Sequence, residues 1–250
     1  MTDFLTKINQ LDAAINRQQV HKQTLEVRQI ISFVKHKNIL PNAPKPLGFL
    51  PNEVEEISQT LTFKQINQFK IINQLFNSLR QFLSVKYGIW SLPNLTTADL
   101  IKENLQIKNG LEIMAGNGYW SKALSQVGVN MIATDSFEWS KTSATGRQTY
   151  YPIYNFDALM AIKKFTNVEL IICSWAPNFT KSDLLAVKTW ERYNPNSHLL
   201  FIGEKKGVTN SPEFWHKMHF SQSSELHQIN QSFSSFDFIN EQVFEIKHEI

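Results

Sequence analysis

Residues 110–124 read GLEIMAGNGYWSKAL, and this stretch decides how the chain folds. A short apolar run precedes two glycines, Gly116 and Gly118, and a run with helical character follows them. Glycine adopts backbone angles closed to other residues and lets a ligand approach the main chain closely. The glycine pair therefore either holds a ligand or only makes a tight turn between a strand and a helix, and the surrounding sequence has to decide.

The segments that follow alternate between expected strands and expected helices. Short apolar runs end at turn residues and predict strands, whereas the runs between them have helical spacing. Such alternation is typical of right-handed βαβ units and a parallel sheet covered by helices on both faces. The sequence thus predicts an α/β fold with a doubly wound, mostly parallel sheet over residues 91–250. The expected strands are GLEIMA, VNMIATD, VELIICSWAP and HLLFIGE, and the expected helices are YWSKALSQVG, DALMAIKKF and SDLLAVKTWERY.

Residues 1–90 have a helical pattern instead. Apolar residues recur at helical spacing from Phe4 to Ile15, and the four prolines of residues 41–51 indicate an extended connector. The strongest helix is predicted from Thr62, whose capping box with Gln65 precedes an apolar stripe that runs to Leu83. A stripe of this length has to be covered, so we expect this helical N-terminal region to pack on the sheet as a lid or substrate module, or else on a partner chain.

Composition excludes several classes of protein. The chain has 250 residues, of which 42% are apolar, and a net charge of +3, which is too weak to imply a nucleic-acid partner. No apolar run approaches the ~18 residues of a membrane span, and the N-terminus lacks the pattern of a signal peptide. With a single cysteine, Cys173, no internal disulfide can form. We therefore expect a cytoplasmic protein that does not bind a membrane.

Acidic residues recur at the expected strand ends. Glu112 lies in the first strand, Asp135 ends the next, and Asp157 stands at the following strand-to-helix junction. In a doubly wound sheet these positions share one edge, where ligands bind. A carboxylate at Asp135 can accept both hydroxyls of a ribose. Asp157 could accept from an adenine amino group or simply cap the next helix.

The order LEIMAGNG, IATD, FDAL, IICSWAP and LLFIGE, within residues 87–207, resembles the Rossmann-like, class I S-adenosylmethionine-dependent methyltransferases. The resemblance implies S-adenosylmethionine as the cofactor. Met114 departs from the pattern, because it stands where the family usually has a glycine. The family's sheet ends in an antiparallel hairpin, for which the C-terminal residues offer one or two strands. The cofactor-binding residues that the resemblance implies, with the neighbours included, are Glu112, Gly116, Asn117, Gly118, Asp135, Ser136, Asp157, Ala158, Ser174 and Trp175.

The leading prediction is a methyltransferase acting on an unknown acceptor, either a small molecule or a nucleic acid. Positioning an electron-rich atom against the methyl group is the main task of such an enzyme, and no catalytic base stands out in the sequence. The alternative is a catalytically silent S-adenosylmethionine-binding or regulatory protein of the same fold, which Met114 favours. NAD-dependent redox chemistry is a weaker alternative, because Ser121 stands where the third glycine of the dinucleotide motif is expected.

Other residues are weighed against simpler roles. Tyr87 and Trp90 lead from the helical region towards the glycines and could form a lid or bury a junction. Trp175 could line a pocket or pack in the core. The loop from Glu204 to Gly207 is a candidate specificity element. No metal site is expected, because His216 and His219 lack a third ligand, and Cys173 is expected to be a buried, inert thiol.

Overall fold

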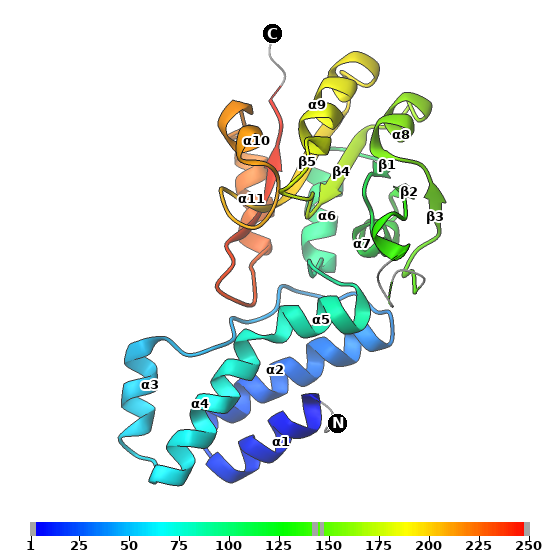
Figure 1. Cartoon of the computed structure of the whole chain (residues 1–250). Coiled ribbons are helices and arrows are strands. Elements are labelled where there is room, and N and C mark those ends of the chain that lie inside the picture. Colours follow the sequence, from blue (N-terminus) through cyan, green and yellow to red (C-terminus); the bar gives the residue numbers. More distant parts are fainter. Residues whose placement is uncertain (1–3, 142–144, 146–147, 248–250) are drawn as a thin grey trace.

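The computed structural model describes residues 4–141, 145 and 148–247. The chain forms two lobes, a sheet with helices on both faces and a bundle of helices below it (Figure 1). In the described part, no helix combines the length and the apolar character needed to cross a bilayer.

A six-stranded sheet, in the order β3-β2-β1-β4-β5-β6, forms the centre of the upper lobe. The first five strands are parallel and β6 is antiparallel to β5. This arrangement confirms the predicted α/β class and the doubly wound, mostly parallel sheet. The strand bounds are β1 Asn109–Glu112, β2 Asn130–Asp135, β3 Ile153–Asn155, β4 Leu170–Ser174, β5 His198–Glu204 and β6 Glu241–Glu245.

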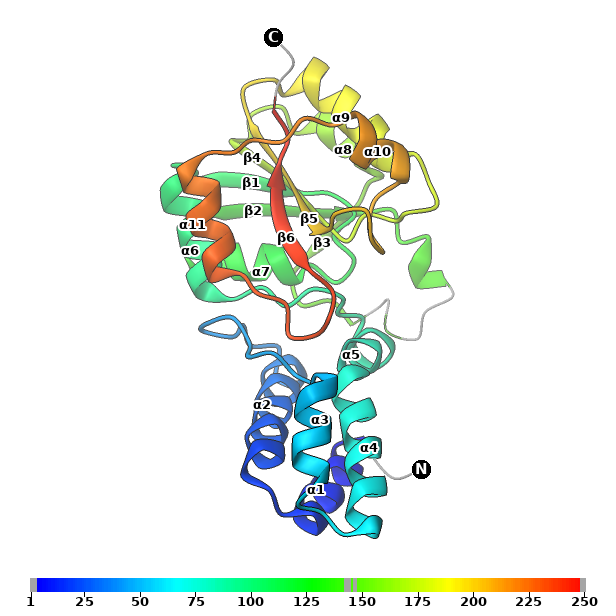
Figure 2. The ribbon, with the colours of Figure 1, turned by 90° about the vertical axis from the view of Figure 1, so that its left-hand side faces the viewer.

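Alternate residues of the central strands face opposite layers, as the period of two of a β-strand requires. In β4, Leu170 and Ile172 belong to one core cluster, whereas Ile171 and Cys173 belong to the other. Figure 2 shows the two helical layers. One consists of α6 Leu95–Asn104, α7 Tyr119–Gln126 and α11 Ser224–Ser232, and the other of α8 Ala158–Lys164, α9 Ser182–Tyr193 and α10 Pro212–Lys217. A short 3-10 turn, η1 Trp139–Lys141, follows β2.

The lower lobe consists of five helices. The predicted capping box at Thr62 is confirmed, since its hydroxyl accepts from the Gln65 N–H and the Gln65 amide oxygen accepts from the Thr62 N–H. The single helix expected from there to Leu83 was wrong, because the chain turns at Ser78 and forms two helices. The bounds are α1 Phe4–Ile15, α2 Gln18–Lys35, α3 Pro51–Ser58, α4 Phe63–Asn77 and α5 Leu79–Tyr87.

The two lobes share one apolar core. A single cluster of buried residues runs from the stripe of α4 and α5, including Phe76 and Leu83, to Trp120 of α7 and to Val243 of β6. Backbone hydrogen bonds such as that from the Leu47 N–H to the Phe236 carbonyl, 2.7 Å, join the lobes as well. The apolar stripe is therefore covered within the chain itself.

The C-terminal part supplies one strand, β6, to the sheet. Among the described residues no second antiparallel strand pairs with it, and the hairpin that the resemblance implies is thus reduced to one strand and an isolated bridge between Phe220 and Ile246. The helices α10 and α11 occupy the chain between β5 and β6 instead.

Candidate cofactor and acceptor site

The glycine loop connects β1 to α7 with three residues in the left-handed region of backbone space. Met114 has a φ of 51°, Gly116 of 55° and Gly118 of 73°. Glycine adopts these angles without cost, whereas a residue with a Cβ loses roughly 1–2 kcal/mol. A glycine at position 114, as in the motif that the sequence resembles, would adopt this angle without strain. The loop keeps that conformation here with a methionine in place.

Glu112 ends β1 and is buried beneath this loop, with 2% of its surface exposed. Its Oε2 accepts a hydrogen bond of 2.7 Å from the backbone N–H of Ser121, in the first turn of α7. Burial raises the pKa of Glu112 to about 7; Ser121 opposes this shift and the nearby Asp135 adds to it. A helix N-terminus attracts anions, and in this chain the carboxyl group of Glu112 already occupies that position.

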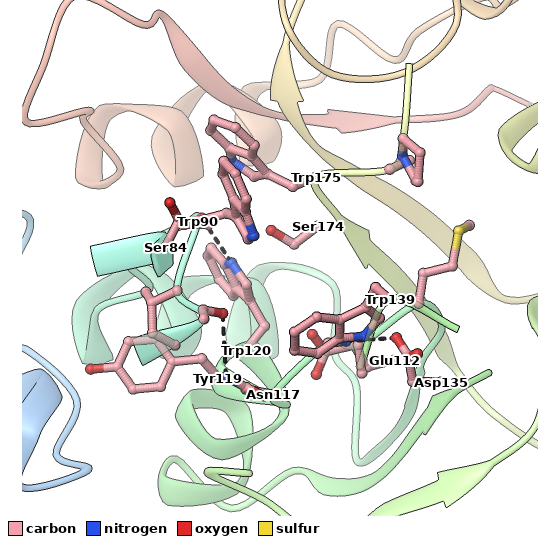
Figure 3. A pocket seen from close by; sticks show the side chains of 18 of the residues that line it. Ser84, Trp90, Glu112, Asn117, Tyr119, Trp120, Asp135, Trp139, Ser174 and Trp175 are labelled. Atoms are coloured by element: carbon pink, nitrogen blue, oxygen red, sulfur yellow. Dashed lines mark hydrogen bonds between the residues drawn. The ribbon is translucent and has the colours of Figure 1, made fainter. Parts of the chain in front are cut away.

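Asp135 ends β2, next to β1 in the sheet, and lies close to Glu112 (Figure 3). Its Oδ2 accepts from the Gly116 N–H at 2.8 Å, and its Oδ1 from the Phe137 N–H at 2.7 Å. Burial raises the pKa of Asp135, and these two hydrogen bonds and a third from the Trp139 side chain oppose the shift. Asp135 therefore holds the glycine loop in place and faces the same space as that loop.

Asn117 ties the glycine loop to the segment that leaves the helical lobe. Its Nδ2 donates to the carbonyl oxygens of Tyr87, at 2.8 Å, and Gly88, at 3.3 Å. A Cβ at Gly88 would collide with that Nδ2, so the close approach requires glycine. The Oδ1 of Asn117 is buried and accepts no hydrogen bond from the described residues. A buried acceptor left unpaired in this way is a polar group that the described residues do not satisfy.

A cavity of about 530 Å³ lies at the carboxyl edge of the sheet and brings these groups together. Its volume falls within the range of small-molecule sites. The walls come from the end of α5 with the following segment, from the glycine loop, from the ends of β2 and β4, and from the loop after β5. The lining residues are Ser84, Gly88, Ile89, Trp90, Ser91, Glu112, Met114, Ala115, Gly116, Asn117, Tyr119, Trp120, Asp135, Trp139, Ser174, Trp175, Ala176, Pro177, Asn178, Phe179 and Val208.

Trp175 both lines this cavity and is fixed by the protein around it. Its φ of 57° is in the left-handed region, and its N–H donates to the Ile202 carbonyl at 2.8 Å. The indole Nε1 donates to Glu241 Oε1 at 2.9 Å, and the Arg80 guanidinium lies 4.8 Å from the ring centroid. The side chain is thus a rigid wall of the cavity.

Six of the ten predicted site residues line the cavity, namely Glu112, Gly116, Asn117, Asp135, Ser174 and Trp175. The other four do not. Gly118 is the N-terminal cap of α7, and Asp157 is exposed and caps α8, where its Oδ1 accepts from the Met160 N–H at 2.9 Å. Ser136 and Ala158 adjoin Asp135 and Asp157 along the chain but are absent from the lining. A cofactor contact at these four residues stays a prediction.

Several lining residues could not be predicted from the sequence. Trp139 lies over the loop, with its Cζ2 4.0 Å from the position that a Cβ of Gly116 would take. Phe179 and Val208 come from loops whose course no local pattern predicts. The loop of Glu204 to Gly207 is held by a hydrogen bond of 3.2 Å from the Val208 N–H to Glu204 Oε2, which places Val208 at the cavity. The number of apolar residues in these loops was the only feature of the sequence that could have pointed to a role in lining a cavity.

The other two candidates from the sequence were the Cys173 thiol and a metal site. Cys173 is buried, and burial raises the pKa of its thiol well above the usual range, so it is an inert thiol. Within the described part of the chain, no three or more histidine, cysteine, aspartate or glutamate side chains gather to hold a metal ion.

Comparison with known proteins gives matches among solved structures only. No protein-family model matches the chain, and no curated protein matches it. The mitomycin 7-O-methyltransferase MmcR aligns with 12% identity over 99% of this chain and 73% of that chain, at a TM-score of 0.40. A SAM-dependent methyltransferase from Archaeoglobus fulgidus aligns with 13% identity over 61% of this chain and 93% of that chain, at 0.36.

A further match, to a protein from Anaeromyxobacter dehalogenans, has 15% identity and a TM-score of 0.32, and covers 42% of this chain and 46% of that chain. The chain thus aligns with about half of that relative. The first two matches are named as methyltransferases. The fold itself rests on the strand order and register described above.

Proposed function

We propose that this chain is an S-adenosylmethionine-dependent methyltransferase with an acceptor still to be identified. One observation supports the proposal above the others. The cavity brings the left-handed glycine loop, Glu112 and Asp135 together at the carboxyl edge of a parallel sheet, which is where such folds bind ligands.

The charged and aromatic groups of the cavity suit the positively charged groups of this cofactor. No lysine, arginine or histidine is among the described residues that line it, and its two carboxyl groups are those of Glu112 and Asp135. The sulfonium cation and the amino group of this cofactor therefore meet acidic and aromatic surroundings, both of which favour positive charge, whereas its carboxylate finds no cationic partner among these residues.

The same groups disfavour a dinucleotide. A pyrophosphate would bind at the N-terminus of α7, and Glu112 already accepts the N–H of Ser121 there. The resemblance assigns the ribose to Asp135 and the methyl end to Ser174 and Trp175. When bound, the cofactor supplies a methyl group on a positively charged sulfur atom. The protein's task is then to orient the acceptor and exclude water, and this requires no dedicated base.

The runner-up is a silent S-adenosylmethionine-binding protein, and Trp139 is the observation that favours it. Its side chain donates to Asp135, so the ribose hydroxyls would have to share this carboxylate with the indole or displace it. If the indole of Trp139 stays on Asp135, the cofactor would bind without its ribose contact, as a protein that does not transfer the methyl group could tolerate. Transfer of a labelled methyl group to any of a panel of small acceptors would decide against the runner-up.

Titration calorimetry with S-adenosylmethionine and S-adenosylhomocysteine tests the proposal. We expect binding to the wild-type protein and an affinity about ten- to a hundredfold lower for Asp135→Asn, because a charged acceptor is lost. Glu191→Gln removes an exposed charge on α9, outside the cavity, and should bind like the wild type. Absence of heat and of a thermal shift at millimolar ligand would overturn the proposal.

A further inference from the structure

The cavity has two distinct parts. Glu112, Asp135 and Asn117 form its floor, at the ends of β1 and β2. Trp90 and Trp175 lie beside one another, apart from the two carboxyl groups, and Ser174 lies between the two parts (Figure 3). We define the aromatic mouth as Trp90, Trp175, Phe179 and Val208, all of which line the cavity.

The aromatic mouth leaves much apolar surface uncovered. Trp90 is 50% exposed, Phe179 86% and Val208 48%. Single exposed apolar side chains are common, but these three line one cavity, where a bound ligand would cover them. Residues that only packed the junction between the lobes would be buried like their neighbours Ile89 and Leu92.

The two tryptophans differ in how they are held. Trp175 is fixed by Glu241 and by the Arg80 guanidinium, as described above. Trp90 leans on it, with the ring centroids 5.5 Å apart and the planes at 30°. Trp90 is fixed through its backbone, because its carbonyl oxygen accepts from Arg80, whereas its indole N–H donates to no acceptor of the described residues. A rigid ring beside a half-exposed one forms a platform on which a further planar ring can stack.

The charge of the lining restricts what this ring can carry. No cationic side chain is among the lining residues that the structure describes, so a phosphate or carboxylate on a ring in the aromatic mouth would find no cationic partner there. The carboxyl groups of the floor would repel it as well. Ser174, whose hydroxyl group is half-buried between the floor and the mouth, can bind a neutral hydroxyl or amino group on the ring.

We propose that the aromatic mouth is the acceptor subsite and that it binds a small, planar, uncharged aromatic or heteroaromatic ring, with a hydroxyl or amino group directed at Ser174. That the bound ring is the methyl acceptor rests on the proposed methyltransferase function. The ring-binding subsite itself is independent of it. An unpaired base in a nucleic acid strand is the competing ligand, and the missing cations disfavour it.

Ligand-observed NMR and fluorescence titration of the full chain without cofactor test the subsite, with 2-naphthol as the probe. We expect 2-naphthol to bind, and decahydro-2-naphthol and 2-naphthyl phosphate to bind about tenfold more weakly or not at all. Trp90→Ala should weaken 2-naphthol binding about tenfold, whereas Trp90→Phe should keep most of it. Phe63→Ala, which removes an 82% exposed ring far from the cavity on α4, is the matched control.

Several results would overturn the inference. These are equal binding of the saturated analogue, tighter binding of the phosphate or of a single-stranded dodecanucleotide, and equal effects of Trp90→Ala and Phe63→Ala. Competition between 2-naphthol and S-adenosylhomocysteine would also do so, since the ring would then bind on the floor. If 2-naphthol binds at Trp90 while S-adenosylhomocysteine does not bind at all, the proposed function fails and the aromatic subsite stands.

Discussion

Glu112 is a buried carboxyl group in the lining of the cavity, and its burial makes the stability of the protein depend on pH. Its pKa is raised from an ordinary 4.5 to about 7, chiefly by burial. Below pH 4.5 the group is protonated in both the folded and the unfolded chain. Between pH 4.5 and 7 the unfolded chain releases this proton while the folded chain keeps it, so the free energy of unfolding falls as the pH rises.

We therefore predict that Glu112 lowers the free energy of unfolding by on the order of 3 kcal/mol between pH 4.5 and 7, with no further change above that range. Glu112→Gln keeps an oxygen that can accept from Ser121 but cannot titrate. Urea denaturation of both proteins across this pH range measures the difference. The variant should show a flatter profile in this window, and parallel profiles would contradict the raised pKa.

The residue scale also shows where sequence reasoning succeeded. The positions of Glu112 and Asp135 followed from the motif, because both stand at the ends of adjacent parallel strands. Trp139 could not be predicted, since its contact with Asp135 depends on a 3-10 turn after β2. For Trp175 the sequence left the choice between wall and core open, and the ring is half-buried and lines the cavity.

At the scale of elements, the strands were predictable and the connections were not. The buried strands β4 and β5 are continuous apolar runs, which the sequence alone is enough to recognise as buried strands. The three-residue strand β3 is half exposed and carries no such signal. The break at Ser78 was hidden as well, because the apolar spacing continues across it from Phe76 to Leu79 while the backbone turns.

Asp157 allows a prediction at this scale, because its helix cap and its predicted adenine contact can be separated. Asp157→Ala should destabilise the protein by about 1 kcal/mol through the loss of the α8 cap, whereas Asp157→Asn keeps a capping oxygen and should cost much less. Thermal unfolding measures both. Because Asp157 lies outside the cavity lining, we expect both variants to bind S-adenosylhomocysteine like the wild type.

If Asp157→Asn weakened binding of S-adenosylhomocysteine about tenfold without loss of stability, the carboxylate would contact the ligand, as the sequence resemblance implies. The cavity would then have to extend past β3 when ligand binds.

At the scale of the whole molecule, Arg80 joins the two lobes. It lies on α5, is buried, and pairs with Asp237 at 2.7 Å and with Glu241 at 3.1 Å, both from the segment that leads into and begins β6. Its guanidinium also donates to the Trp90 carbonyl and lies over the Trp175 ring. One side chain of the helical lobe thus fixes the C-terminal strand and both tryptophans of the aromatic mouth.

Arg80→Met should therefore destabilise the protein by roughly 3–5 kcal/mol, because two buried carboxylates lose their partner. Asp237→Asn leaves Glu241 paired and should cost less. Arg28→Met, which removes an exposed arginine from α2, is the matched control and should change the free energy of unfolding by at most about 0.5 kcal/mol. Urea unfolding is followed by tryptophan fluorescence, which reports on the sheet lobe and on Trp90 at the junction, and by far-UV circular dichroism, because α1 to α5 contain no tryptophan. If Arg80→Met were no more destabilising than Arg28→Met, the lobes would be held by the shared apolar core and the backbone hydrogen bonds, without a contribution from the ion pairs. In that case Trp90 and Trp175 would keep their positions without the ion pairs.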